Sequence, residues 1–540
     1  MKKILSFLLA AALLSGCVMT GCKKSESSSK KDEKKIAAST DKYRNFYQIF
    51  MYSFADSNGD HVGDFNGITE QLDYLNDGDP NGGNDLGIDG LWLTPITPSE
   101  SYHKYSVEDY YNVDPSFGTL DDFDKMLEEC HKRGISVIID LVLNHISYKN
   151  PLFLSACDEV RQGKLDGDAE YFEFHEPSYY TPSTKVIQVG DFVCEANFSE
   201  TMPEWNLTSQ KTRDEFTKIA KFWLDRGVDG FRLDAVKYFE NKHTDGVEFL
   251  KWFTDTCRGI KSDVYLVGEE WADTADIETL YASGIDSLFA FRFAESSGEI
   301  VQSVSTSNGQ SLAKKLVNYD KKMTAANPGY INAMFLSNHD QVRIANSLES
   351  RGLAAQKFAA NVYLLTPGNS FTYYGEELGM RAEKTDDPTD KDRYYRQAMV
   401  FDSDNPQDIT VNGFKTTQMP TGGGVKQQLE DKNSLLNHYR KLYTAKLQNP
   451  SLARGRATEQ QSFDDKAVCA FYVEKDGEKL LVIHNFSEKE AKTLEITDEM
   501  LKNAEIAISM PTSDDGDKIV LSDGKLTLPA YSSVVLRSAA

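Results

Sequence analysis

Cysteine is scarce in this chain of 540 residues, and its placement excludes two kinds of site. No CxxC pair and no cluster of cysteine with histidine occurs, so the sequence offers no cysteine-ligated zinc site. Beyond the N-terminal region the cysteines are Cys130, Cys157, Cys194, Cys257 and Cys469. An odd number cannot be completely paired within one chain, although Cys157 and Cys194 remain candidates for a local pair. We therefore assign no chemistry to cysteine.

The chain also has fewer basic than acidic residues. Lysine and arginine number 59 against 83 aspartates and glutamates, which gives a formal net charge of -24. Such a chain repels phosphate groups, so the composition argues against nucleic acid or an anionic membrane surface as a partner. An acidic surface suits a protein that acts on a neutral substrate.

Long hydrophobic runs are missing as well. The apolar run Ile4–Leu14 follows Lys2 and Lys3 and is too short to cross a bilayer as a stable helix. It ends in Leu14-Ser15-Gly16-Cys17, which resembles the signal of a bacterial lipoprotein, where cleavage leaves the cysteine to carry lipid. The run therefore predicts a lipidation site at Cys17.

Two alternatives exist for this N-terminal region. One is an ordinary secretory leader cut nearby, and the other is lipidation of Cys22 in Met19-Thr20-Gly21-Cys22. Residues 23–41 are rich in serine and lysine, which is typical of a flexible tether. We expect a lipoprotein signal region over residues 1–22 and an extracellular, cell-surface protein that touches the membrane only through its lipid anchor.

From residue 46 onward, short apolar runs alternate with amphipathic segments of helical period. The candidate strands are Tyr47–Phe54, Gly90–Pro95, Val137–Leu143, Gly230–Val236, Tyr265–Glu269, Ser287–Phe293, Ile331–Ser337 and Phe371–Tyr374. The clearest helices are Leu120–Lys132, Ser209–Asp225, Val247–Gly259 and Gln356–Leu365. Eight strands that alternate with helices favour an α/β fold of the (β/α)8 TIM-barrel type over a doubly wound sheet.

Two stretches depart from this alternation. The sixty or so residues after the third strand are rich in aromatic and turn residues, and a compact fold rarely carries a structureless loop of roughly that length. After about residue 450 the pattern changes to alternating strands, including Val468–Val473, Leu480–Asn485 and a pair within Leu526–Leu536 broken at Pro529. The predicted domains are a catalytic barrel of residues 42–145 and 207–450, an inserted domain B of residues 146–206, and a C-terminal antiparallel β-sandwich of residues 451–540.

The loop after the first strand carries oxygen side chains at alternate positions. The candidate metal ligands are Asp56, Asn58, Asp60 and Asp64, together with the carbonyl of Val62. Hard oxygen ligands in this number suit calcium better than magnesium, which prefers octahedral, partly hydrated sites. The loop is not an EF-hand, because His61 stands at the turn glycine and Gly67 at the twelfth position. The alternative is a loop of Asx turns without an ion; we expect calcium.

Charged side chains gather at the ends of several predicted strands. Arg232 and Asp234 leave the same face of a buried strand, and a buried carboxylate needs a cation or a polar cleft. Glu269 ends the next strand beside an aromatic ring, a setting that raises a carboxyl pKa. Asp340 ends another strand. Because the carboxyl ends of barrel strands meet at one mouth, we expect these side chains to converge there.

Facing carboxylates of this kind serve glycosidic cleavage by a nucleophile and an acid/base. The chain from about Tyr47 to the C-terminus resembles the α-amylase superfamily of retaining α-glucoside hydrolases. The resemblance is carried by DLVLNH at 140–145, GFRLDAVK at 230–237, VGEEW at 267–271 and FLSNHD at 335–340, in the family's order. These four motifs fall on the expected strands.

The resemblance implies a role for each matching residue. Asp234 would be the nucleophile, Glu269 the acid/base, and Asp340 the carboxylate that fixes and distorts the sugar. The residues implied in substrate binding are His103, Tyr105, His145, Arg232, Lys237 and His339. The implied partners are starch, maltooligosaccharides and related α-glucans, with calcium as cofactor, and we expect a monomer.

Within this family we expect an endo-acting α-amylase, because Ala235-Val236-Lys237 after the nucleophile is similar to the α-1,4-specific members. An alternative is a neopullulanase or oligo-1,6-glucosidase, since Met202-Pro203-Glu204-Trp205-Asn206 resembles a motif of those relatives. A rival of another class is a starch-binding surface protein without catalysis. The complete set of three carboxylates argues against that rival.

Overall fold

The computed structural model describes residues 44–79, 83, 85–382, 391–410, 419–498, 503–513 and 518–538. The predicted signal region, the lipidation site at Cys17 and the tether of residues 23–41 lie outside the described residues. No helix among the described residues is long and apolar enough to cross a membrane.

Eight parallel strands form the central sheet, in the order β10-β11-β1-β2-β3-β7-β8-β9. Their bounds are β1 Asn45–Ile49, β2 Gly90–Leu93, β3 Ser136–Leu141, β7 Gly230–Leu233, β8 Tyr265–Gly268, β9 Ser287–Leu288, β10 Ala333–Phe335 and β11 Asn369–Tyr373. A parallel bridge between Phe289 and Ala333 joins the two ends of this order, so the sheet closes. The predicted (β/α)8 barrel is confirmed.

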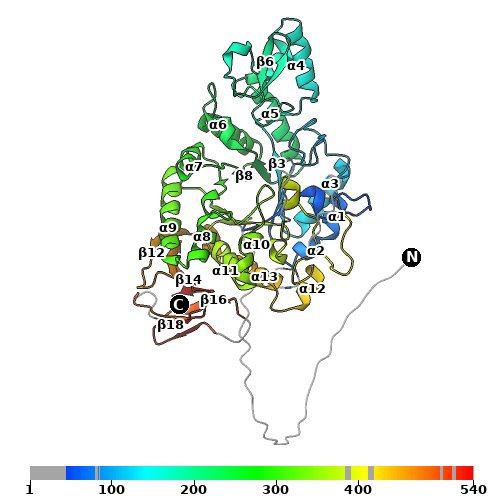
Figure 1. Ribbon diagram of the computed structural model, residues 1–540. Helices are drawn as coiled ribbons and strands as arrows, with labels where there is room; N and C mark the ends of the chain where they lie inside the picture. The colour runs from blue at the N-terminus through cyan, green and yellow to red at the C-terminus, as the bar shows by residue number, and fades with distance from the viewer. Residues whose placement is uncertain are drawn as a thin grey trace, which may run out of the picture. The chain divides into compact units, whose positions relative to one another are not determined.

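Helices cover the outside of the barrel strands (Figure 1). Their bounds are α1 Phe65–Glu70, α2 Leu72–Leu75, α3 Leu120–Lys132, α5 Gln210–Asp225, α6 Gly246–Ile260, α7 Thr274–Leu280, α8 Glu299–Thr306, α9 Gly309–Ala326, α10 Ile344–Ser347, α11 Gly352–Leu364, α12 Val425–Glu430, α13 Leu435–Gln448 and α14 Pro450–Arg454. The helix α3 shows why they form: Thr119 and Asp122 make a capping box at its start. Phe123, Met126 and Leu127 then recur at helical spacing on its buried face.

Large apolar side chains fill the barrel interior. Phe46 of β1 stacks on Phe371 of β11 with ring centroids 4.6 Å apart, and Trp92 of β2 and Phe289 lie in the same cluster. Each strand alternates between this interior and the helix layer, because successive strand residues point to opposite faces. The interior is therefore packed, and a site can form only at the strand ends.

Between β3 and β7 the chain forms the insertion that the sequence predicts, and this insertion contains a separate small sheet. This insertion contains α4 Pro151–Arg161 and the strands β4 Phe174–His175, β5 Val186–Val189 and β6 Phe192–Glu195, in the order β4-β6-β5. An antiparallel bridge between Phe172 and Trp205 ties its two ends together. The exact bounds of 146–206 for a domain B stay a prediction.

After α14 the chain forms two antiparallel sheets, which confirms the predicted C-terminal β region. One has the order β12-β13-β14-β19-β16, and the other β15-β18-β17. Their bounds are β12 Arg456–Gln460, β13 Val468–Lys475, β14 Glu478–Asn485, β15 Lys492–Glu495, β16 Glu505–Pro511, β17 Val520–Ser522, β18 Lys525–Leu528 and β19 Ser532–Arg537. The start of α9 contacts this region, since Gln310 donates its backbone N–H to the carbonyl of Lys466 at 3.0 Å.

The five cysteines of the described residues are all free and buried. Cys157 and Cys194 therefore do not form the local pair that the sequence left open. Burial raises the pKa of the Cys157 thiol to about 11, which keeps it protonated and unreactive at neutral pH.

Candidate active site

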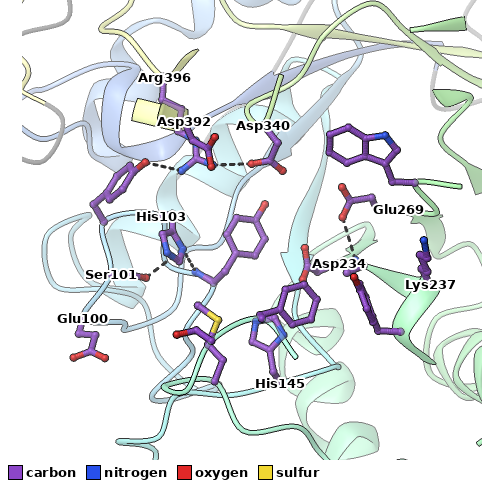
Figure 2. A pocket seen from close by; sticks show the side chains of 18 residues that line it. Glu100, Ser101, His103, His145, Asp234, Lys237, Glu269, Asp340, Asp392 and Arg396 are labelled. Atoms are coloured by element: carbon purple, nitrogen blue, oxygen red, sulfur yellow. Dashed lines mark hydrogen bonds and ion pairs between the residues drawn. The ribbon is translucent and has the colours of Figure 1, made fainter. Parts of the chain in front are cut away.

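A cleft of about 910 Å³ lies at the carboxyl ends of the barrel strands. Among its lining residues are Asp234, Glu269 and Asp340, which Figure 2 shows converging from different strand ends. The sequence-predicted His103, Tyr105, His145 and Lys237 line the same cleft. The predicted Arg232 and His339 are buried and contact these lining residues from below, so the structure brings all nine predicted catalytic and substrate-binding residues together.

Arg232 at the end of β7 joins the carboxylates of the cleft floor. Its Nη1 lies 2.8 Å from Oδ1 of Asp234 and 2.5 Å from Oδ1 of Asp140, and its Nη2 lies 2.8 Å from Oε2 of Glu269. The guanidinium is only 1% exposed and lies over the ring of Trp92. One buried cation therefore stabilises three carboxylates that would otherwise be costly to bury.

The backbone turns sharply after Asp234. Ala235 adopts a left-handed conformation with φ 43°, which is strained for a residue with a side chain. In this turn its N–H donates to Oε2 of Glu269 at 3.1 Å, while the side chain of Asn144 donates to the carbonyls of Asp234 and Ala235. The turn thus fixes the two carboxylates relative to one another.

Glu269 has the properties of a proton donor. Burial raises the pKa of Glu269 to about 8, with Arg232 opposing the shift and Asp234 and Asp340 adding to it. Glu269 is 8% exposed as a residue and still lines the cleft. At neutral pH the protonated form predominates, which is the form that a general acid needs.

Asp340 is held in the opposite protonation state. Burial alone would raise its pKa, but the charges of Arg396 and Arg232, and that of His339 when its ring is protonated, outweigh burial and lower the pKa to about 2. Arg396 donates from Nη2 to Oδ1 of Asp340 at 2.7 Å and from Nη1 to the Tyr102 hydroxyl at 2.9 Å. Asp340 is therefore an ionised acceptor at all ordinary pH values.

His339 is buried beneath the cleft as a neutral ring. Burial lowers the pKa of His339 to about 3, and its ring stacks on Tyr105 with centroids 5.6 Å apart. The amide of Gln48 donates to Nδ1 at 2.7 Å, so the ring proton is on Nε2, which faces the Tyr105 hydroxyl at 2.7 Å. This chain of contacts holds the Tyr105 ring in place at the cleft wall.

Two more histidines face the cleft. His103 accepts the N–H of Tyr105 at Nδ1, and burial lowers its pKa to about 3, so Nε2 carries the proton. His145 is 2% exposed, and neither of its ring nitrogens has a hydrogen-bond partner among the described residues. Buried polar atoms without partners are uncommon, and a ligand hydroxyl would satisfy them.

The other end of the cleft is more open. Lys237 lies in the short 3-10 turn Val236–Phe239 after β7 and is exposed. Trp271 is 46% exposed and stacks on Phe291 at 5.1 Å, while Tyr238 packs against Phe198. Such exposed rings are suited to stacking on sugar faces.

Sequence reasoning missed Arg396. Its guanidinium is 3% exposed, lies over the rings of Phe50 and Tyr102, and contacts Asp340 from the far side of the cleft. The segment around it, Arg393-Tyr394-Tyr395-Arg396, is short and polar and belongs to none of the predicted strands or helices. No spacing rule links it to Asp340.

The loop of residues 56–64 carries the predicted calcium ligands outside the cleft, but its three aspartates, all among the described residues, do not form a cluster with ligand atoms within 4.8 Å of one another. Asp56 accepts three backbone N–H groups of its own loop, Asp60 accepts that of Val62, and Asp64 caps α1 through Gly67. His61 takes the left-handed conformation, φ 73°, at the place of the turn glycine. The loop offers carboxylate, amide and carbonyl oxygens, which are the donor types that calcium prefers. In the structure the side chains of Asp56, Asn58 and Asp60 accept backbone N–H groups of the loop, as in Asx turns, so calcium binding here stays a prediction.

Three family models match the chain. The catalytic domain of alpha-amylase matches residues 48–455, and the C-terminal domain of alpha-amylase SusG matches residues 468–535. A model of the prokaryotic membrane lipoprotein lipid attachment site matches residues 1–17, which end at the predicted Cys17. The first match covers the barrel, the insertion and every cleft residue described above.

Relatives aligned over most of their length are also alpha-amylases and related glucosidases. Alpha-amylase 3 of Dictyoglomus thermophilum is 33% identical over 502 residues, covering 92% of this chain and 93% of the relative. An oligo-1,6-glucosidase of Parageobacillus thermoglucosidasius is 28% identical over 552 residues, covering 88% and 95%. The solved structure of Eubacterium rectale Amy13B superposes with a TM-score of 0.82 at 35% identity, covering 93% of this chain and 96% of that one. Each alignment extends across most of both chains.

Proposed function

Because the chain belongs to the alpha-amylase family of glycoside hydrolases, we propose that it cleaves internal α-1,4 bonds of starch and maltooligosaccharides with retention of configuration. The observation that carries this proposal is the guanidinium of Arg232, which lies between Asp234 and Glu269 at 2.8 Å from each. Two carboxyl groups brought together on one guanidinium supply the facing nucleophile and acid/base that a retaining mechanism needs.

The first half of the reaction forms a bond to Asp234. Its carboxylate, held by Arg232 at 2.8 Å, attacks the anomeric carbon of the sugar, and the carboxyl proton of Glu269 passes to the glycosidic oxygen. The bond from carbon to that oxygen breaks, and the leaving chain departs with a new hydroxyl group. Asp340 accepts hydrogen bonds from the hydroxyls of the same sugar.

The second half releases the sugar. Glu269, now a carboxylate, takes a proton from a water molecule, and the water oxygen attacks the anomeric carbon from the face that the leaving chain vacated. Asp234 leaves as a carboxylate, and Glu269 is protonated again. Two inversions give a product with the starting α configuration.

The surrounding side chains position the sugar. The ring of Tyr105, held by His339, provides the stacking face, and the free nitrogens of His145 and His103 meet hydroxyl groups. Lys237 and Trp271 line the more open end of the cleft, where the leaving chain would lie. Aromatic and polar groups thus extend beyond the reacting sugar, which supports internal cleavage of a long chain.

A second candidate activity is hydrolysis of α-1,6 bonds. It is favoured by Met202, which lines the cleft as part of the motif Met202–Asn206, and by the oligo-1,6-glucosidase among the relatives. Product analysis on amylose, pullulan and panose separates the two activities. Short maltooligosaccharides from amylose with intact panose support the α-1,4 proposal, whereas preferred cleavage of panose supports the second candidate.

The experiment that tests catalysis itself is release of reducing ends from soluble starch. We expect activity in the intact chain and its loss in Asp234→Asn, with starch binding retained in the variant. Proton NMR should show α products first. A protein that binds starch without releasing reducing ends would be the non-catalytic surface protein instead, and β products first would refute retention.

We further propose that calcium binds the loop of residues 56–64. The ligands would be side-chain oxygens of Asp56, Asn58, Asp60 and Asp64 with the carbonyl of Val62. When bound, the ion supplies structural support to the loop that leads into α1, and it takes no part in bond cleavage.

The lipid attachment match supports a surface location. We propose that Cys17 carries lipid and holds a monomeric enzyme outside the cell, where it cuts polymer too large to import. The alternatives are lipidation of Cys22 and a cleaved secretory leader.

A further inference from the structure

Two potential metal ligands share one face of a strand in the insertion. Glu173 and His175 flank Phe174 at the start of β4, and alternate residues of an extended chain point to the same side. Phe174 points the other way and packs in the aromatic cluster with Phe153 and Phe172. The apolar contact of Phe174 thus directs the carboxylate and the imidazole together away from the core.

A third ligand comes from the barrel. His243 belongs to the loop between β7 and α6, where the side chain of Asn241 accepts the backbone N–H groups of His243 and Thr244. This Asx turn points the His243 ring at the insertion. Its Nε2 lies 3.9 Å from Oε2 of Glu173, and Nε2 of His175 lies 3.4 Å from the same oxygen.

The three ligand atoms are close to metal-binding geometry. They all lie within 4.8 Å of one another, and a tetrahedral zinc site with bonds of about 2.0–2.1 Å places its ligand atoms roughly 3.3 Å apart. The three side chains are between 16% and 40% exposed and have room to move. A small movement would bring their ligand atoms to the spacing of a zinc site. The Tyr179 hydroxyl contacts Nε2 of His243 and lies within reach of a fourth position.

Three carboxyl groups lie around the cluster, with Lys242 nearby over the ring of Tyr179. The Oε1 atom of Glu173 is buried without a hydrogen-bond partner among the described residues. Burial and then the neighbouring Glu195 raise the pKa of Glu204 to about 7, and burial raises that of Glu195, with the charge of Glu173 adding to both shifts. Three carboxylates are crowded here, and a bound divalent cation would relieve their repulsion.

We propose that Glu173, His175 and His243 bind one zinc ion, which ties the insertion to the loop after the nucleophile strand. Two imidazole nitrogens and one carboxylate oxygen form a donor set typical of zinc and disfavoured by calcium, which takes oxygen ligands. This zinc site is separate from the calcium loop and does not depend on the reaction proposed above. Zinc bound here would stabilise the wall of the cleft, because the same β7–α6 connection carries the cleft residues Lys237 and Tyr238.

The test is a zinc titration of the full-length chain, purified in detergent, stripped with a chelator and returned to excess calcium. We expect one zinc ion per chain with submicromolar affinity, measured by competition with a chromophoric chelator, and a higher melting temperature when zinc is present. Cobalt bound in place of zinc should give the visible absorption of a four- or five-coordinate ion.

Three variants decide the assignment. His175→Gln, His243→Gln and Glu173→Gln each keep side-chain volume and should lower zinc affinity by at least about 100-fold, since even loss of an outer partner costs 10–100-fold. His131→Gln is the control, because His131 is a partly exposed histidine that pairs with Asp229 outside the cluster. Zinc that fails to bind the intact chain, or that stays bound equally in folded variants of the cluster, would overturn the proposal.

Discussion

Arg232 shows how a single side chain decides the chemistry of the cleft. It is the cation nearest to Asp234, Asp140 and Glu269 together, at 2.5–2.8 Å from each. Removing one partner of such a buried network is strongly destabilising, by about 3–5 kcal/mol, because uncompensated charge remains. The residue therefore serves stability as well as the placement of Asp234.

The raised pKa of Glu269 predicts the alkaline limb of the pH profile. A proton donor must be protonated, and the folded-state pKa of about 8 keeps it so below that pH. We expect kcat/KM on maltooligosaccharides to fall by about tenfold for each pH unit above 8. Glu269→Gln should lose this limb and retain part of the first step with activated leaving groups. A wild-type profile that stays flat well above pH 8 would contradict the role of Glu269 as the acid.

Arg396 is predicted to position Asp340 and, through it, the sugar. Its three donated bonds reach Asp340, the Tyr102 hydroxyl and the carbonyl of His339. Hydrogen bonds to charged groups contribute about 1.5–3 kcal/mol each, so Arg396→Gln should lower kcat/KM by roughly 10–150-fold. Arg396→Lys should recover part of it. Steady-state kinetics on a defined maltooligosaccharide measure the loss, and Arg381→Lys, which alters a surface ion pair with Glu349, is the control. Equal losses of kcat/KM in Arg396→Gln and in the control Arg381→Lys would mean that Arg396 acts only on folding.

The difference between Asp340 and Arg396 shows what sequence can reveal at this scale. Asp340 follows a predicted strand, and the barrel rule places all such positions at one mouth. Arg396 lies 56 residues later in an irregular segment, and only the folded chain brings its guanidinium to 2.7 Å from Asp340. Residues of irregular loops have no period from which their position can be inferred.

At the level of elements, the eight barrel strands were predictable but several of their ends were not. The predicted strand Ser287–Phe293 is reduced to β9, Ser287–Leu288, followed by the 3-10 turn Phe291–Phe293. Ala290 still donates its N–H to the carbonyl of Ala333 in β10 before the chain turns away. Apolar residues continue through the turn because they pack inside the barrel, so hydrophobicity alone could not locate the end.

The contact between α9 and the C-terminal sheets predicts an effect of a single methyl group. A Cβ at Gly309 would lie 2.6 Å from the backbone nitrogen of Cys469 and 2.8 Å from the carbonyl oxygen of Ala467. Backbone atoms of a packed sheet cannot move far to make room for a methyl group. Gly309→Ala should therefore destabilise the fold by about 1–3 kcal/mol. Gly259→Ala in α6 is the matched control, since nothing lies within 4 Å of its Cβ, and it should stabilise by roughly 0.5–1 kcal/mol. Urea unfolding measures both, and equal midpoints would refute the close approach.

The loop before α1 predicts a dependence of stability on calcium. Ion binding to the native state raises its stability by mass action, by about 2.7 kcal/mol at a hundred times the dissociation constant. Adding a chelator should therefore lower the melting temperature, and calcium should restore it. Asp60→Asn keeps an acceptor for the N–H of Val62 and removes only the charge, so it should weaken the calcium response. Asp158→Asn, on a surface helix, is the control. A melting curve indifferent to chelator and calcium would rule out the site.

At the scale of the whole molecule, three features point to one working arrangement. The net charge of -24 opposes binding to phosphate-rich partners, the cleft lies in the part of the chain that matches the alpha-amylase catalytic domain, and the N-terminus matches a lipid attachment site. The sequence predicted the order of these parts, because each has its own period or motif. It could not predict how the insertion meets the β7–α6 loop, since the contacts between His243 and Glu173 join segments 70 residues apart.

Replacing the anchoring cysteine should detach the enzyme from the cell without changing its chemistry. One acyl chain binds membranes only marginally, and stable anchoring requires the several chains that lipoprotein processing supplies. Cys17→Ser should therefore release active enzyme into the medium with unchanged kcat/KM on maltooligosaccharides, as measured by activity in cell and medium fractions. Retention that persists in Cys17→Ser and is lost in Cys22→Ser would move the anchor to the second cysteine. Retention in the double variant would reject lipidation, because no cysteine would then remain in the signal region to carry the lipid.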